Sequence, residues 1–149
     1  MPVIDISKAP LKTGSIYPAP YGAQMAGRSS IRLGEAGGLS QFGANIVILA
    51  PGAKSSLRHW HLNEDEFVMV TQGVCTLIDD HGRFEMGVGD CAAFPAGDTN
   101  GHHFVNRTEQ PASFLVIGTS NRDEVAWYSD IDMVVRSGVF ARKDGGPVE

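Results

Sequence analysis

The sequence lacks long apolar runs and runs of basic residues. No stretch approaches the roughly 20 apolar residues of a transmembrane helix, and residues 1–14 contain no apolar core of a secretory signal. The 12 Lys and Arg residues are scattered among 17 Asp and Glu, giving a net charge of -5, so no basic surface for a polyanion is expected. The length of 149 residues suits one domain. We therefore expect a cytoplasmic protein with no membrane or nucleic-acid partner.

Cysteine is also rare, with Cys75 and Cys91 as the two examples in the chain. They do not form a CxxC pair, which argues against a zinc site built from thiolates. A cytoplasmic compartment disfavours a disulfide. We expect two free thiols that are buried in strands.

Helical periodicity is missing from every long segment, and the one helical turn that we expect covers residues 121–128. Short β-type runs are present instead, separated by turn signals such as Pro51-Gly52, Gly73 and His81-Gly82. Many short strands with regular turns predict an all-β sandwich or barrel. The expected strands cover residues 29–33, 42–49, 67–71, 74–78, 83–86, 90–94, 102–106 and 113–118, with an edge strand from the segment 129–140.

Composition divides the chain into three parts. Residues 1–28 are rich in Pro, Gly, Ala and Ser, which predicts an extended N-terminal arm that packs on the domain or on a partner subunit. We expect residues 29–140 to form a single β-barrel domain and residues 141–149 to form a flexible tail.

Histidine is scarce as well, but four of the five histidines fall into two clusters. His59 and His61 are two residues apart, so on a strand their side chains point to the same face. Glu66 follows, and His102 lies roughly forty residues further along the chain. Neutral imidazoles with one carboxylate form a mixed nitrogen and oxygen donor set, which suits Fe, Mn, Ni, Zn or Co.

The residues around these clusters resemble the two motifs of the cupin superfamily. The first stretch has a glycine, HxH, a glutamate and a second glycine at positions 52, 59–61, 66 and 73. The second has a glycine, PxG, a histidine and an asparagine at positions 89, 95–97, 102 and 106. The resemblance covers residues 42–119. It departs from the common pattern in two gaps, since the one before His59 is one residue longer and the one before His102 is two residues longer.

This resemblance implies a cupin double-stranded β-helix, or jelly-roll barrel. It also implies that a divalent metal ion (Fe, Mn, Ni, Zn or Co) is held by His59, His61, Glu66 and His102. The candidate catalytic bases are Glu66, which would then have a second role, and a metal-bound water. Apolar walls from Phe94, Phe104 and Met69 would limit the ligand to a small molecule.

Two of the ligand positions have a rival close by. Glu64 can replace Glu66, because it lies in the same acidic turn. His103 can replace His102, because the loop before it is lengthened. We prefer His102 because it keeps the three-residue spacing to Asn106, a residue that we expect to order a turn.

Small single-domain cupins include sugar or sugar-phosphate isomerases, dioxygenases and lyases, so the resemblance implies a metal-dependent enzyme that acts on a small polar metabolite. The alternative is a non-catalytic module that binds or senses a small ligand. The barrel alone does not choose between these functions. Cupins of this size often pair through their sheet edges, so the resemblance also implies a homodimer. Arg28, Arg32 and Lys54 are too scattered in the sequence to predict a phosphate pocket.

Overall fold

The computed structural model describes residues 2–148, and strands make up most of the regular structure. The strands are β1 (Leu11–Thr13), β2 (Arg28–Arg32), β3 (Phe42–Leu49), β4 (His59–His61), β5 (Glu66–Gln72), β6 (Cys75–Asp79), β7 (Gly82–Met86), β8 (Cys91–Phe94), β9 (His103–Val105), β10 (Ala112–Thr119), β11 (Val125–Tyr128), β12 (Val134–Arg136) and β13 (Val139–Ala141). The helical segments are short: η1 (Ile6–Lys8), η2 (Tyr21–Met25) and α1 (Leu33–Ala36).

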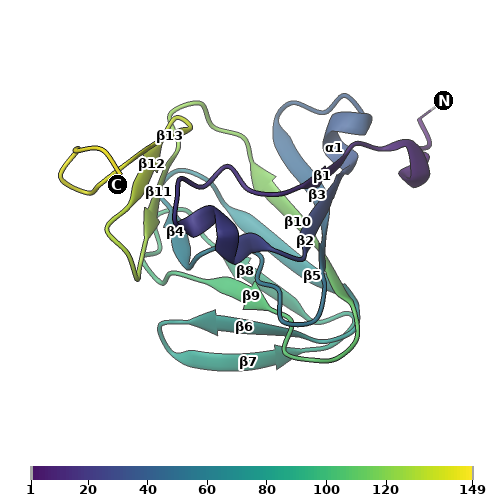
Figure 1. The fold of residues 1–149 in the computed structure, drawn as a ribbon. Helices are drawn as coiled ribbons and strands as arrows, with labels where there is room; N and C mark the ends of the chain where they lie inside the picture. Colours follow the sequence, from purple (N-terminus) through teal and green to yellow (C-terminus); the bar gives the residue numbers. More distant parts are fainter. Residues whose placement is uncertain (1, 149) are drawn as a thin grey trace.

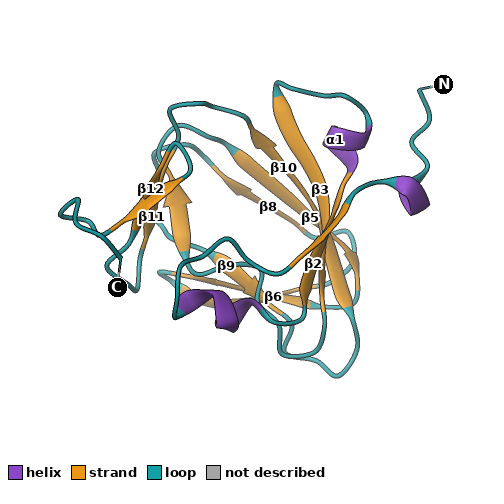
Figure 2. Ribbon diagram, turned by 45° about the horizontal axis from the view of Figure 1, so that its top comes forward, coloured by secondary structure: helices purple, strands orange, loops and turns teal. Residues whose placement is uncertain are grey.

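The strands form three antiparallel sheets. The largest has the order β1-β2-β3-β10-β5-β8, and the others have the orders β13-β12-β11-β4 and β7-β6-β9. Figure 1 shows the β6–β7 hairpin below the large sheet and the β11–β13 strands at the left end. Figure 2 shows the same arrangement from a second direction, with the strands surrounding an interior. The all-β fold predicted from the sequence is therefore confirmed.

The interior is built by the period-two alternation of the strands. Along β5, Val68 and Val70 are buried, whereas Phe67, on the opposite face of the strand, is 40% exposed. Strand β10 pairs with both β3 and β5, so that Phe114 lies beside Val47 and Val70. These side chains also point into the interior. One hydrophobic core results, made of Val47, Leu49, Ala53, Val68, Val70, Cys75, Leu77, Met86, Phe104, Ala112 and Phe114.

A buried asparagine ties the turn before β10 to the end of β3. The Nδ2 group of Asn106 donates to the Leu49 carbonyl at 2.9 Å and to the Gln110 carbonyl at 2.7 Å. Its Oδ1 atom accepts hydrogen bonds from the Thr108 backbone and hydroxyl at 2.9 and 2.8 Å. Asn106 thus orders a turn, as the sequence predicts, and its side chain is fully satisfied.

The turn between β5 and β6 requires a glycine, in agreement with the predicted break at Gln72-Gly73. Gly73 has φ of 67°, a left-handed conformation. A Cβ atom at this position would lie 2.6 Å from the Pro111 carbonyl oxygen. Only a residue without a side chain lets these two turns approach each other.

The helical turn expected over residues 121–128 is wrong, because residues 125–128 form β11. This strand pairs with β4 and with β12, so tertiary pairing overrides the weak local pattern. The edge strand expected after residue 129 is present as β12 and β13.

Both cysteines are free, as expected. Cys75 is buried in β6, but Cys91 is exposed at the start of β8, so the prediction of two buried thiols is wrong for Cys91.

The N-terminal segment contains η1 and η2, and β1 lengthens the large sheet by pairing with β2. The arm, domain and tail boundaries stay predictions. Among residues 2–148, no helix is long and apolar enough to cross a membrane.

Candidate metal centre

The first histidine cluster lies on β4, at the edge of the four-stranded sheet. His59, Trp60 and His61 pair in register with Tyr128, Trp127 and Ala126 of β11. The alternation of the strand sends both histidines to the interior, while Trp60 stacks on Trp127 on the other face, with ring centroids 6.2 Å apart.

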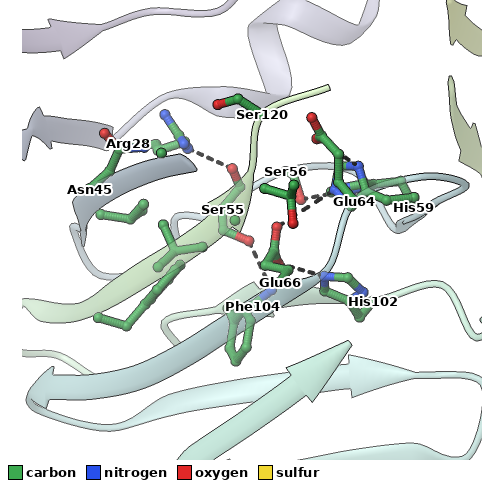
Figure 3. A pocket seen from close by; sticks show the side chains of 17 residues that line it. Arg28, Asn45, Ser55, Ser56, His59, Glu64, Glu66, His102, Phe104 and Ser120 are labelled. Atoms are coloured by element: carbon green, nitrogen blue, oxygen red, sulfur yellow. Dashed lines mark hydrogen bonds and ion pairs between the residues drawn. The ribbon is translucent and has the colours of Figure 1, made fainter. Parts of the chain in front are cut away.

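His59, Glu66 and His102 lie together on one side of a pocket (Figure 3), and His61 also lines this pocket. The Nε2 atoms of His59 and His61 lie 3.1 Å apart. Glu66, on the same face of β5 as Val68, places Oε2 3.6 Å from His61 Nε2. Its Oε1 atom lies 2.9 Å from His102 Nε2. Four side chains from three separate segments therefore converge.

His102 is held rigidly beside His59. The backbones of the two residues form an isolated antiparallel bridge, with hydrogen bonds of 2.9 and 3.2 Å. The His102 side chain is buried, and its ring stacks on Phe94 with centroids 3.5 Å apart. A Cβ atom on the preceding Gly101 would overlap the Ser129 hydroxyl, so this close approach of the two segments requires glycine.

The two rival residues, His103 and Glu64, do not join this group of four side chains. His103 places its Nδ1 atom 2.8 Å from the Ser56 carbonyl and does not line the pocket. Glu64 lies in the pocket wall, but its Oε1 atom is 3.8 Å from His61 Nδ1, the ring nitrogen opposite the one that faces Glu66. The geometry thus groups Glu66 and His102 with the two histidines of β4.

Burial and mutual repulsion make His59 neutral. Burial, followed by the charges of His61 and His102, lowers the pKa of His59 to about 3. Burial alone would raise the pKa of Glu66, but hydrogen bonds from His102 and His61 outweigh it and hold that pKa well below the ordinary value. Glu66 is therefore a carboxylate at neutral pH.

The donor set fits a divalent metal. His59 Nδ1 lies 2.8 Å from the Leu57 carbonyl, which can accept a hydrogen bond only from a protonated Nδ1, so the His59 Nε2 lone pair is free. This lone pair points at the Nε2 atom of His61, where two imidazoles and a carboxylate crowd together. A cation between these atoms satisfies all of them, and the mixed nitrogen and oxygen donors suit a first-row metal.

A second layer of carboxylates stands behind His61. Glu124 Oε1 lies 3.5 Å from His61 Nδ1, and Glu64 Oε1 lies 3.8 Å from it. These three side chains form a His/Glu cluster that could also hold an ion. The sequence did not single out Glu124, because only the pairing of β11 with β4 brings it near His61.

The pocket has a volume of about 360 Å³, which suits a small molecule. Phe104 forms part of its wall, as predicted, whereas Phe94 stacks on His102 and Met69 is not a lining residue. The lining also includes Arg28, which the sequence gave no reason to place beside the histidines. The other residues that line the pocket are Gly43, Asn45, Val47, Ser55, Ser56, His59, His61, Glu64, Glu66, His102, Phe114, Val116, Gly118, Thr119 and Ser120.

Comparisons with known proteins agree with this geometry. The family model described as Cupin domain matches residues 45–118. A sugar phosphate isomerase of the cupin superfamily from Silicibacter pomeroyi DSS-3 is 59% identical, covers 99% of this chain and 97% of its own, and superposes with a TM-score of 0.97. The chain belongs to the cupin superfamily. Cupins typically bind a metal, and this cupin has a possible His/Glu site for one.

Two further structures resemble this cupin. A proposed sugar phosphate isomerase from Acidithiobacillus ferrooxidans is 28% identical over 76% of this chain and 74% of its own, with a TM-score of 0.71. A polyketide cyclase from Streptomyces resistomycificus is 21% identical over 81% and 80% of the two chains, with a TM-score of 0.64, and shows the fold alone. No curated protein matches the chain.

Proposed function

We propose that this cupin is a metal-dependent isomerase of a small sugar phosphate. The observation that carries the proposal is the convergence of three histidines and Glu66 at one end of a small pocket. The likeness to a sugar phosphate isomerase at 59% identity over nearly the whole chain supports the substrate class.

In this proposal His59, His61, Glu66 and His102 hold the metal. A bound divalent ion would hold two neighbouring oxygens of the substrate and polarise its carbonyl group. The buried imidazole of His59 stays neutral, because its pKa is lowered to about 3, and its Nε2 atom is available to the ion. Phe94 and Phe104 pack edge to face beside His102, with ring centroids 6.2 Å apart, and make this side of the site apolar.

Glu66 is also the residue that we propose to move a proton. Its Oε1 atom is engaged by His102, whereas Oε2 is 3.6 Å from His61 and faces the pocket. An aldose–ketose interconversion needs one base that takes a proton from one carbon and returns it to the next. Glu64, which also lines the pocket, is the alternative base.

The test is an NMR assay of metal-reconstituted protein with a panel of three- to six-carbon sugar phosphates in deuterated water. An isomerase produces the ketose or aldose partner and incorporates deuterium at the carbon next to the carbonyl. His59→Ala should abolish both signals. Glu66→Gln should lose metal and activity, whereas a Glu64→Gln variant that keeps the metal and loses activity would assign the base to Glu64.

If the metal-loaded protein converts no member of the panel, the isomerase proposal is wrong and a binding module remains. The choice of metal that supports turnover also distinguishes an isomerase from an oxygenase. Turnover with redox-silent zinc supports the isomerase, because an oxygenase requires a metal that changes its oxidation state.

We also propose a cytoplasmic homodimer. Two free cysteines suit a reducing compartment. Phe42 and Phe67 are 41% and 40% exposed and line a shallow groove with Ile117 on the outer face of the large sheet. Such an apolar surface is suited to a second copy of the chain. Light scattering that finds a monomer at micromolar concentration would contradict the dimer.

A further inference from the structure

Arg28 is the one Arg or Lys side chain in the lining of the pocket. It begins β2, and its Nε atom donates a hydrogen bond of 2.6 Å to the Ser55 carbonyl. Figure 3 shows Arg28 on the side of the pocket away from His102 and Glu64. The pocket therefore has a cationic side and a separate side that carries the histidines and carboxylates.

The charge of Arg28 has no acidic partner among residues 2–148. Within these residues, the guanidinium makes one hydrogen bond, from Nε–H to the Ser55 carbonyl. Its Nη groups have no protein acceptor in the same range. Arg58 makes a useful contrast, because its guanidinium bonds to Asp80 at 2.7 Å and to Asp130 at 2.8 Å. A partly buried cation without a carboxylate is costly unless an anion joins it.

The surroundings of Arg28 increase the need for an anion. Burial lowers the pKa of Arg28, and the nearby charge of Arg32 lowers it further. Both side chains lie on the inward face of β2, with the buried Ser30 between them, since alternate strand residues share a face. Opposite Arg32, in register on β3, Asn45 adds a side-chain amide to the pocket wall.

We propose that the guanidinium of Arg28 binds the phosphate group of the substrate, a role that rests on the proposed sugar-phosphate isomerase. Arg28 uses its free Nη donors for the phosphate oxygens, because a planar guanidinium matches two of those oxygens at once. The reacting carbons then lie toward Glu66 and the histidines. Arg28 determines specificity for the phosphorylated form of the sugar.

The simpler role for Arg28 is to clamp the loop before β4 through the Ser55 carbonyl. The Leu57 carbonyl of the same loop accepts from His59, so a purely structural Arg28 would act on metal binding and on stability. The two roles predict different outcomes for Arg28→Gln and Arg28→Lys. The lysine variant keeps a positive charge for phosphate but loses the hydrogen bond from Nε to the Ser55 carbonyl.

Inorganic phosphate is the probe, and isothermal titration calorimetry on the full chain measures its binding. We expect Arg28→Gln to weaken phosphate binding at least tenfold, because a charge-assisted hydrogen bond is lost. Arg28→Lys keeps the charge but not the bidentate geometry, so its affinity should lie between those of the wild type and Arg28→Gln. Arg107→Gln removes an exposed charge outside the pocket and should leave the affinity within twofold of the wild type. The metal content of Arg28→Gln should match the wild type, and its thermal midpoint should fall only slightly, through loss of the hydrogen bond to the Ser55 carbonyl.

The His59→Ala variant, which should lack the metal, distinguishes phosphate binding by Arg28 from phosphate binding by the metal of the proposed isomerase. Phosphate held by Arg28 still binds to His59→Ala, whereas phosphate held by a metal does not. The inference is overturned if the wild type does not bind phosphate, if Arg28→Gln binds it normally, or if His59→Ala abolishes binding. It is also overturned if acetate binds as tightly as phosphate, or if Arg28→Gln loses metal and stability together. Arg28-dependent phosphate binding without turnover of any sugar phosphate would refute only the isomerase.

Discussion

Replacing Glu124 tests whether the carboxylates behind His61 matter for the metal site. Its Oε1 atom lies 3.5 Å from His61 Nδ1. The same carboxylate is fixed by backbone N–H groups, at 2.9 Å from Leu62 and 3.1 Å from Asn63. A carboxylate held in this position keeps the proton of His61 on Nδ1 and leaves Nε2 to face Glu66 and His59.

The size of the effect follows from this geometry. Loss of an outer partner of a metal-binding histidine costs about 10- to 100-fold in metal affinity, which is about 1.4 to 2.7 kcal/mol. The distance of 3.5 Å is longer than a good hydrogen bond, so we expect Glu124→Gln to lie near the tenfold end. Glu124→Ala also removes the carboxylate acceptor of the Leu62 and Asn63 N–H groups, of which Leu62 keeps the Val125 carbonyl, and should approach 100-fold with a lower thermal midpoint.

The assay is competition for zinc or cobalt against a chromogenic chelator, with the thermal midpoint measured on the same samples. Glu109→Gln is the matched control, because Glu109 is exposed and lies outside the pocket. An affinity of Glu124→Gln within twofold of the wild type would refute the reasoning. So would an equal loss in the control variant.

Three other predictions concern stability. Asn106→Ala removes four hydrogen bonds and should lower the free energy of unfolding by about 3 to 4 kcal/mol in urea titrations, and a loss under about 1 kcal/mol would contradict this. Gly101→Ala forces the segment away from Ser129 and should lower the thermal midpoint and the metal affinity together; unchanged values of both would refute the close approach. Hydrogen bonds from Arg58 hold the pKa of Asp130 below its ordinary value of 3.8, so this ion pair stabilises the fold above that pH and is lost as pH falls through the lower folded pKa. Asp130→Asn should therefore lower the thermal midpoint at pH 7, and a difference that does not shrink as the pH falls through the lowered pKa of Asp130 would contradict the assignment.

The sequence predicts the local parts of this structure well. Alternation and turn residues locate strands such as β3 and β5, because a half-buried strand leaves a period-two pattern. The spacing of His59 and His61 predicts a shared face, which β4 provides. Motif spacing also favours Glu66 and His102 over their neighbours, and the geometry groups these two with the β4 histidines.

The parts that the sequence does not predict depend on contacts between distant segments. Arg28 enters the pocket because β2 pairs with β3, a long-range choice that no local pattern records. Glu124 stands behind His61 because β11 pairs with β4. The same pairing turns residues 125–128 into a strand where a helical turn was expected.

Elemental analysis of protein purified without chelators or an affinity tag tests the central claim most directly. After metal reconstitution, we expect one divalent ion per chain in the wild type. The double variant with His59→Ala and His61→Ala should contain none while keeping the far-ultraviolet circular dichroism spectrum of a folded barrel. Wild-type protein that retains no stoichiometric metal, or a double variant that retains it, would contradict the assignment of the metal centre.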